Sequence, residues 1–319
     1  MRLLVTGGMG FIGSHFIHYM LEQYPNYEIV NLDSLTYAAN WSNLSEAERL
    51  PTYTFIQGDI RNERLVNEII ANGIDVVVHF AAESHVDRSI DSPEPFVSTN
   101  IIGTYRLLES ARRHAVSKFV HVSTDEVYGS ADDGMKFTET TQLAPNSPYS
   151  ASKASSDLLV RAYHQTYGLP AIITRCSNNY GPKQYPEKLI PKSIIHALRN
   201  EPIPIYGDGL QIRDWLYVTD HCAALAAVMH QGVSGEIYNI GGGCGGLTNV
   251  EVVQRICNVL GKSSDCMQFI DDRPGHDRHY AIDFSKLNKT LGWRPLVEFD
   301  EGLAHTVRWY MDNEGWWRE

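Results

Sequence analysis

The sequence has no surplus of positive charge and no long apolar run. Lys and Arg total 27 against 38 Asp and Glu, which leaves a formal net charge of −11 over 319 residues. A protein that binds nucleic acid or an anionic membrane needs a basic face, so this composition argues against both classes of partner. No apolar stretch approaches the roughly 20 residues that cross a bilayer, and we expect no membrane segment.

Cysteines are few and are not spaced for metal binding or disulfide pairing. There are five, an odd number, and no two stand in CxxC spacing. We therefore expect reduced thiols in a cytoplasmic protein, without a disulfide framework. The N-terminus enters a strand-like pattern at Arg2 and lacks the layout of a signal peptide. In segment 82–88, His85 and Asp87 are too few ligands for a metal, so we expect no metal site.

Apolar residues make up 43% of the chain, enough for a real core. Short continuous apolar runs alternate with longer helical patterns, which predicts a doubly wound α/β fold of Rossmann type with a parallel sheet. Strands are expected at 3–6, 28–32, 53–56, 76–78, 118–122 and 171–174, and helices at 12–23, 61–71, 96–114 and 149–167.

The regular alternation ends at about residue 176, where prolines become frequent. We expect a first domain over 1–176, to which the chain returns near 213–232, and a smaller α/β lobe over 177–319. The glycine-rich run 241–246 is expected to be a flexible connection.

The first strand leads into TGGMGFIG, in which Gly7, Gly10 and Gly13 have GxxGxxG spacing. Glycines at this spacing let the backbone turn sharply and approach a pyrophosphate, and the following helix offers free N–H groups to the phosphates. Asp33 ends the second strand, where a carboxylate accepts hydrogen bonds from ribose hydroxyls and repels a 2′-phosphate. The pattern predicts a dinucleotide site that favours NAD over NADP. The alternative is an ordinary βαβ turn with a surface Asp.

A second pattern, SPYSASK, begins at Ser147, an expected helix N-cap. Tyr149 and Lys153 are four residues apart and share a helix face. A nearby ammonium favours the phenolate, which could take a proton from a sugar hydroxyl. Thr124 lies between the two motifs in sequence. Taken alone, YxxxK spacing is equally consistent with two helix residues that merely share a face.

Asp125 and Glu126 follow the expected strand 118–122 and the hydroxyl pair Ser123-Thr124. Two adjacent carboxylates beyond a strand end could both reach one sugar. Their mutual repulsion and burial would keep one of them protonated, which suits one acid and one base. The alternative is an exposed acidic loop.

These motifs together resemble the extended short-chain dehydrogenase/reductase family over nearly the whole chain. STDEVYG, SPYSASKA, RCSNNYGP, PEKLIP, YGDG with RDW, and RPGHDR with YAID are similar to the nucleotide-sugar 4,6-dehydratases of that family. The resemblance implies oxidation of a nucleotide-diphosphate sugar, most readily dTDP-glucose, at C-4 by bound NAD, loss of water across C-5 and C-6, and hydride return to C-6. Most relatives, such as nucleotide-sugar epimerases and decarboxylases, lack the Asp-Glu pair after the Thr.

The resemblance also implies residue roles. Glu126 is the base at C-5, Asp125 the acid at C-6, Tyr149 the acceptor of the C-4 hydroxyl proton, and Thr124 its hydrogen-bond partner, with Lys153 beside Tyr149. Cofactor-binding positions are Gly7, Gly10, Phe11, Ile12, Gly13, Asp33, Asp59, Ile60, Ala82, Tyr149 and Lys153. Substrate-binding positions are Ser84, Asn178, Glu187, Lys188, Leu189, Tyr206, Arg213, Asn249, Arg273 and Tyr280. Taken alone, Arg213 or Arg273 is more simply explained as a surface ion pair.

Other functions stay open on the sequence: a dehydratase of UDP-glucose or another nucleotide sugar, a 4-epimerase or decarboxylase, or a non-catalytic NAD sensor. Lys183 stands where the family usually has an aromatic residue, and the 241–246 run is longer than expected. Both departures lie on the substrate side, so the preferred base is not fixed. The resemblance further implies a homodimer through helices 96–114 and 149–167.

Overall fold

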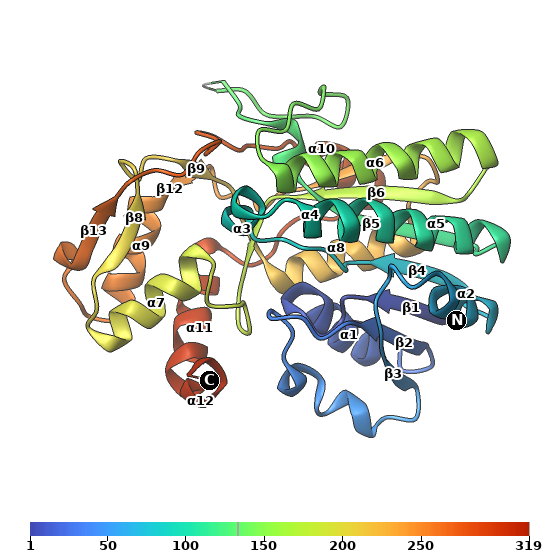
Figure 1. The fold of residues 1–319 in the computed structure, drawn as a ribbon. Coiled ribbons are helices and arrows are strands. Elements are labelled where there is room, and N and C mark those ends of the chain that lie inside the picture. The colour runs from blue at the N-terminus through green and yellow to red at the C-terminus, as the bar shows by residue number, and fades with distance from the viewer. Residues whose placement is uncertain (133, 319) are drawn as a thin grey trace.

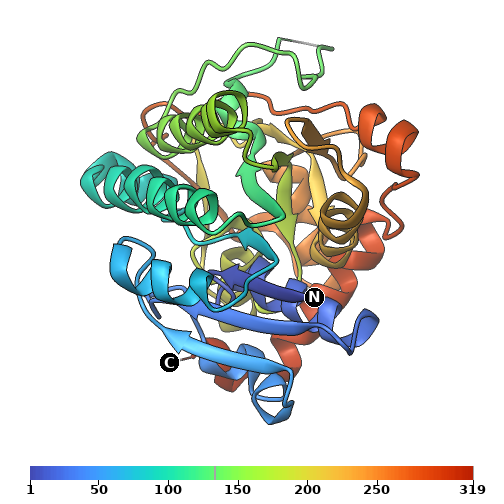
Figure 2. The ribbon, with the colours of Figure 1, turned by 90° about the vertical axis from the view of Figure 1, so that its right-hand side faces the viewer.

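A seven-stranded parallel sheet forms the centre of the computed structural model, which describes residues 1–132 and 134–318 (Figures 1 and 2). The strand order is β11-β6-β5-β4-β1-β2-β3. Runs such as Val76–His79 are buried on both faces of the sheet, as parallel strands require. The strands are β1 Arg2–Thr6, β2 Glu28–Asp33, β3 Tyr53–Gln57, β4 Val76–His79, β5 Lys118–Thr124, β6 Ala171–Cys176 and β11 Ile237–Ile240.

Helices cover both faces of this sheet. α1 (Phe11–Gln23) and α8 (Val218–Gln231) pack on one face, and α2 (Glu63–Ala71), α5 (Thr104–Arg113) and α6 (Pro148–Tyr167) pack on the other. The order reverses between β1 and β4, so the carboxyl ends of the strands open into a crevice there. The prediction of a doubly wound α/β fold is confirmed.

Two predicted helices differ from the observed ones for local reasons. The helix expected at 61–71 begins at Glu63, because the Asn62 side chain accepts a hydrogen bond from the Leu65 N–H and caps it. The helix expected at 96–114 is built of three joined segments: α4 (Glu94–Phe96), a π-helical stretch η3 (Val97–Gly103), and α5.

A smaller lobe lies beside the carboxyl ends of the strands (left in Figure 1). It is held together by apolar side chains from four helices and by short strand pairs: β8 with β13, β9 with β12, and β7 with β10. Its elements are β7 Asn178–Tyr180, α7 Leu189–Arg199, β8 Ile203–Tyr206, β9 Ile212–Arg213, β10 Trp215–Tyr217, β12 Leu247–Thr248, α9 Asn249–Val259, β13 Met267–Ile270, α11 Phe299–Asp312 and α12 Glu314–Trp317.

The chain returns from this lobe to the sheet through α8 and β11, and β11 pairs with β6. The exact domain boundaries stay a prediction. Loop 241–246 is tied down, because the backbone N–H groups of Gly242 and Cys244 donate to the Asp214 carboxylate at 2.6 and 3.1 Å. The expected flexible connection is therefore an anchored loop.

Short elements complete the description: η1 Trp41–Leu44, η2 Ala47–Arg49, α3 Val86–Asp91, η4 Asp125–Tyr128, η5 Ser264–Cys266 and α10 Ser285–Leu291. Over residues 1–132 and 134–318, no helix has the length and apolar character needed to cross a membrane. The same residues contain no cluster of three or more His, Cys, Asp or Glu suited to a metal ion.

Candidate active site

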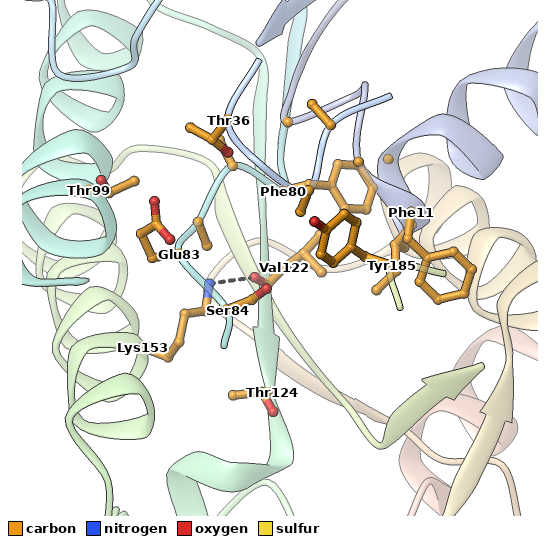
Figure 3. A pocket seen from close by; sticks show the side chains of 18 of the residues that line it. Phe11, Thr36, Phe80, Glu83, Ser84, Thr99, Val122, Thr124, Lys153 and Tyr185 are labelled. Atoms are coloured by element: carbon orange, nitrogen blue, oxygen red, sulfur yellow. Dashed lines mark hydrogen bonds between the residues drawn. The ribbon is translucent and has the colours of Figure 1, made fainter. Parts of the chain in front are cut away.

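A cleft of about 320 Å³ follows the carboxyl ends of the sheet strands (Figure 3). That volume suits a small-molecule ligand. The cleft brings together most of the residues singled out in the sequence, from the glycine loop to the acid pair. Its lining includes Gly7, Gly10, Phe11, Ile12, Gly13, Asp33, Asp59, Ile60, Ala82, Ser84, Thr124, Asp125, Glu126, Tyr149, Lys153, Asn178, Glu187 and Lys188.

Three glycines of the first loop are required for different physical reasons. A Cβ on Gly7, where φ is +74°, would lie 2.6 Å from the Ala81 nitrogen, and one on Gly13 would lie 2.3 Å from the Gly7 oxygen. A Cβ on Gly10 would meet only the Gly7 oxygen, at an ordinary 3.4 Å. The protein therefore needs glycine at the first and last positions for its own packing. At Gly10 the space that a side chain would fill belongs to the cleft.

The N-terminus of α1 faces this loop without a competing anion. Its first turn contains no acidic residue and no capping side chain. Free N–H groups and the positive end of the helix dipole are therefore available to phosphate oxygens.

Asp33 is buried at the end of β2 and is oriented by the backbone. Its Oδ2 accepts from the Met9 N–H at 2.9 Å and its Oδ1 from the Leu35 N–H at 2.8 Å. Burial raises the pKa of this carboxyl, and the two N–H groups oppose the rise. Each oxygen keeps a further lone pair for a ribose hydroxyl. Together with the space at Gly10 and the free α1 N-terminus, these residues fit a dinucleotide.

Tyr149 and Lys153 lie in the first turns of α6, which starts at Pro148 as the capping pattern predicts. The Ser147 side chain accepts from the Ser150 N–H, and the helix places both residues on the cleft side. Lys153 Nζ donates to the Val122 oxygen at 2.8 Å (dashed line in Figure 3).

The two side chains titrate as buried groups. Burial raises the pKa of Tyr149 well above its usual value, and Glu126 adds to the rise. Burial lowers the pKa of Lys153 to about 8. The expected lowering of the Tyr149 pKa by Lys153 is therefore outweighed by burial, and a further positive charge beside the phenol is needed to favour the phenolate.

Thr124, Asp125 and Glu126 mark the passage from β5 into the short helix η4. The Thr124 hydroxyl caps η4 by accepting from the Glu126 N–H at 3.3 Å. Burial raises the pKa of Asp125 well above the usual range, and the neighbouring Glu126 raises it further. Burial also raises the pKa of Glu126. An acid pair of this kind can hold one carboxyl protonated at neutral pH.

Three cations face Glu126 from the smaller lobe. Arg273, Lys188 and Arg213 each lower its pKa against the effect of burial. Lys188 Nζ is fixed by donating to the Ser84 oxygen at 2.8 Å. The cations therefore favour the ionised form of Glu126, while Asp125 is held toward the protonated form.

Several predicted substrate residues lie beyond the cleft lining and contact each other. Arg213 lies 4.1 Å from the centre of the Tyr280 ring, and both are buried. Arg273 donates to Asp87 Oδ1 at 2.8 Å, and Tyr206 donates to the other oxygen of Asp87 at 3.0 Å.

Two further candidates are less directly placed. Asn249 starts α9 and donates to Gln211 at 3.4 Å. Leu189 starts α7, one residue beyond the cleft residue Lys188.

The cleft also contains residues that the sequence did not single out. Some of them come shortly after a predicted acid, as Ser34 and Thr36 follow Asp33. Their position after a strand end could have indicated that they line the cleft. No sequence feature indicates Thr99 as a cleft residue, because it comes from the π-helical stretch η3, which the sequence does not reveal. The additional lining residues include Ser34, Thr36, Arg61, Phe80, Glu83, Thr99, Ser177, Gln184 and Tyr185.

Comparisons with known proteins agree with this geometry. Residues 4–306 match the family model described as GDP-mannose 4,6 dehydratase. A dTDP-glucose 4,6-dehydratase of Actinoplanes sp. is 49% identical over 322 residues, covering 99% of this chain and 100% of that protein. The structure of a dTDP-glucose 4,6-dehydratase from Streptomyces venezuelae, solved with NAD bound, has a TM-score of 0.97 at 51% identity, covering 100% of this chain and 99% of that one.

A third relative shares the fold at lower identity. UDP-glucose 4-epimerase of Thermotoga maritima has a TM-score of 0.91 at 31% identity, covering 98% of this chain and 100% of that one. The fold therefore serves more than one reaction, and the chemistry must be argued from the site.

Proposed function

The chain belongs to the family described as GDP-mannose 4,6 dehydratase, and from this premise we propose that it is an NAD-dependent dTDP-glucose 4,6-dehydratase. It is a hydro-lyase that converts dTDP-glucose into its 4-keto-6-deoxy derivative and water. The resemblance noted in the sequence is confirmed at the level of the family and of its dTDP-glucose-specific members.

The observation that carries the proposal is the acid pair. Asp125 and Glu126 lie in the same cleft as Tyr149 and Lys153, at the end of β5. Epimerisation at C-4 needs only hydride removal and return. Elimination across C-5 and C-6 also needs a base and an acid, and the cleft supplies two carboxyls in different electrostatic surroundings.

The cofactor is NAD. The pyrophosphate would be held by the loop at Gly10 and the N-terminus of α1, and the ribose by Asp33. Ile60 and Ala82 line the same end of the cleft. Asp59 lines it too, with its carboxylate paired to Arg61 Nη2 at 2.6 Å. Bound NAD supplies the hydride acceptor for C-4, the donor for C-6 and a positive charge beside the Tyr149 phenol.

Oxidation at C-4 uses Tyr149 and its neighbours. Tyr149 takes the proton of the C-4 hydroxyl, and Thr124 orients the hydroxyl by hydrogen bonding. Lys153 carries a positive charge below about pH 8, and this charge favours the phenolate of Tyr149. Because both residues are buried, the charge acts at low dielectric, where it is worth most.

Elimination uses the acid pair in the roles that the sequence predicts. Glu126 removes the proton from C-5; burial raises its pKa, and Arg273, Lys188 and Arg213 oppose that rise and so favour its ionised form. Asp125, kept protonated by burial and by Glu126, gives its proton to the C-6 hydroxyl, which leaves as water. Glu126 then returns its proton to C-5 as hydride reaches C-6.

The nucleotide diphosphate is assigned to the lobe side of the cleft. Arg213 and Arg273 offer permanent charge to the phosphates, and Asn178, whose Oδ1 has no hydrogen-bond partner among the described residues, lies at the lobe side of the cleft. Ser84, Glu187, Lys188, Leu189, Tyr206, Asn249 and Tyr280 complete the assigned substrate contacts.

We also propose a cytoplasmic homodimer. Large apolar side chains are exposed along the surface of η3 and α6, which with α5 form one side of the molecule (Figures 1 and 2). Val97, Ile102 and Leu158 are each more than two-fifths exposed. A second copy that packs α5 and α6 into a four-helix contact would cover them. The five cysteines are free thiols, which suits a reducing compartment.

The experiment is to incubate the purified protein, without added cofactor, with dTDP-glucose, UDP-glucose, CDP-glucose and UDP-N-acetylglucosamine, and to follow mass. Loss of one water, fastest from dTDP-glucose, is the expected result. Water loss that is faster from another nucleotide sugar would keep the chemistry and contradict the substrate. Interconversion of glucose and galactose without water loss would contradict the dehydratase.

A further inference from the structure

Two of the five free cysteines lie in contact with each other in the smaller lobe. Cys257 belongs to α9, and Cys266 ends η5 directly before β13. Their Sγ atoms are 3.7 Å apart, although nine positions separate the residues in the sequence. Neither cysteine is among the described residues that line the cleft, so the proposed reaction gives this pair no role.

The fold holds the two thiols together. Both belong to the small apolar cluster that joins α7, α9, β8 and β13. Between them in the sequence, Lys262 Nζ donates to the backbone oxygen of Ala197 and to Asn200 Oδ1, which fastens the connecting segment to the end of α7. The contact between the sulfurs is therefore part of the packing of the lobe.

The two thiols differ in their access to an oxidant. Cys257 is 1% exposed, whereas Cys266 is only partly buried. Burial, and then the neighbouring Cys266 thiol, raises the pKa of Cys257 to about 11, so Cys257 is protonated at neutral pH. Oxidants attack accessible thiols that can ionise, so Cys266 is the residue that reacts first. A buried thiol in contact with it is then placed to resolve the product.

A metal ion is the alternative partner for two neighbouring thiols. A structural zinc site needs four protein ligands, and two cysteines supply half of them. Over residues 1–132 and 134–318, no group of three or more His, Cys, Asp or Glu is suited to a metal ion. A covalent bond between the two sulfurs is the chemistry that remains for this pair.

We propose that Cys257 and Cys266 form a reversible disulfide on exposure to peroxide, and that this bond fastens α9 to β13 within the smaller lobe. The Cys266 sulfur attacks one oxygen of hydrogen peroxide, the O–O bond breaks, and a sulfenic acid and a first water form. The Cys257 sulfur then attacks the sulfenic sulfur, the S–O bond breaks, and a second water leaves with the Cys257 proton. The two thiols together lose two electrons, and the peroxide gains them. A small thiol such as glutathione reverses the step by thiol–disulfide exchange.

The bond requires a local movement and has a local effect. The sulfurs must approach from 3.7 Å to about 2.05 Å. Cys266 can make this movement because residues 263–265, which precede it, are exposed. The bond closes a short loop and so restricts the unfolded chain, which stabilises the folded lobe. Because the pair lies outside the cleft lining, the rate of the catalysed reaction stays the same.

The test treats the NAD-loaded protein with hydrogen peroxide, blocks the remaining thiols, and digests the denatured chain with trypsin in the absence of reductant. Cleavage after Arg255, Lys262 and Arg278 places the two cysteines on separate peptides, 256–262 and 263–278. We expect these peptides to be joined, with a mass two hydrogen atoms below their sum, and to separate on reduction. The melting temperature of the oxidised protein should rise by about 2–5 °C.

Two variants make the test specific. Cys266→Ser should give neither the joined peptides nor the rise in melting temperature. Cys244→Ser is the matched control, because Cys244 is also only partly buried but its Sγ donates to Asp214 rather than to a thiol. C244S should behave as wild type does. After peroxide treatment, water loss from dTDP-glucose should be as fast in wild type as in C266S.

Three results would overturn the proposal. Sulfinic acid on Cys266 without joined peptides would show that the two sulfurs do not meet. Joined peptides without a rise in melting temperature would contradict the stabilisation of the lobe. Slower water loss in oxidised wild type than in oxidised C266S would show that the bond acts on the cleft. The peptide and melting measurements need no substrate, so they test the disulfide even if the proposed function fails.

Discussion

The two ends of the cleft are built in different ways. At the cofactor end, the loop after β1 and the carboxylate that ends β2 lie side by side because their strands are neighbours in the sheet. At the substrate end, Arg213 comes from the short strand β9 and Arg273 from a loop of the smaller lobe, and they are held by Tyr280 and Asp87. Backbone geometry fixes the first end, and pairs of side chains fix the second.

This difference decides which end tolerates change. Backbone N–H groups and the space at Gly10 bind through shape, so an added atom disturbs them most. The charged side chains of the lobe act through electrostatics, so loss of a charge disturbs them most. The acid pair stands where the two ends meet, and its chemistry needs both.

The largest effect is expected where the ends meet. Asp125→Asn keeps the shape but cannot act as an acid, so we expect product formation to fall by about 10²–10⁴-fold. Oxidation at C-4 should persist, and the near-ultraviolet absorbance of the reduced cofactor should build up after substrate is added. Asp208→Asn, at an exposed ion pair with Arg278, is the matched control and should behave as wild type. A D125N rate within about tenfold of wild type would contradict the assigned role.

The next effect belongs to the substrate end. Arg273→Met removes the guanidinium, and charge-assisted hydrogen bonds are worth about 1.5–3 kcal/mol, so KM for dTDP-glucose should rise about 10–150-fold. The NAD content of the purified protein should not change, because Arg273 is not at the cofactor end. Asp87→Asn keeps the guanidinium and removes only the negative charge of its partner, so it should raise KM less than Arg273→Met does. If KM is unchanged in R273M, Arg273 does not bind substrate and only forms a structural ion pair with Asp87.

The cofactor end of the cleft could be predicted from the sequence more fully than the substrate end. The glycine loop, Asp33 and the Tyr149–Lys153 pair were predictable because each rests on local spacing or on a strand end. The acid pair was predictable because both carboxyls are adjacent in the chain.

The pairing of Arg273 with Asp87 was not predictable, because 186 residues separate the partners and only the folded lobe brings them together. The π-helical stretch η3 was not predictable either, because its residues are ordinary for an α-helix. Its side chain Asn100 bridges the Glu83 backbone and Ser152 Oγ, which are tertiary contacts.

The next largest effects are expected at two glycines of the cofactor loop, whose alanine variants form a matched pair. For Gly10→Ala the fold has room, so we expect a melting temperature close to wild type and NAD affinity lower by about tenfold, roughly the 1–3 kcal/mol of a steric clash. Gly13→Ala places its Cβ 2.3 Å from the Gly7 oxygen, so it should lower both the melting temperature and the NAD content. Calorimetry and NAD released on denaturation measure the two quantities. Equal losses of stability in both variants would remove the distinction between them.

The pH dependence of Lys153 gives a smaller effect with a definite sign. Burial lowers its pKa to about 8, so kcat should fall to about half near pH 8 as Lys153 loses its charge. Between about pH 8 and the usual lysine pKa, the unfolded chain binds more protons than the folded one, so this residue makes the free energy of unfolding rise with pH. Activity and stability should therefore change in opposite directions. The difference in stability between wild type and Lys153→Met, measured by denaturant unfolding at several pH values, isolates this contribution, and a difference independent of pH would contradict the lowered pKa.

The smallest effect is expected at Lys183, the departure from the family pattern that left the preferred base open. Its backbone is in the left-handed region, with φ at 64°, and its Nζ donates to the Asn43 oxygen at 2.9 Å, so the side chain connects the lobe to the segment after β2. Lys183 is absent from the lining of the cleft. Lys183→Met should lose one hydrogen bond and therefore about 1 kcal/mol of stability. It should keep the ratio of kcat/KM between dTDP-glucose and UDP-glucose within about twofold. The two substrates differ by one methyl group in a pocket, and Lys183 does not contact that pocket. A shift of the ratio by about tenfold or more would mean that the substrate end extends to Lys183 and that its recognition of the base reaches beyond the cleft.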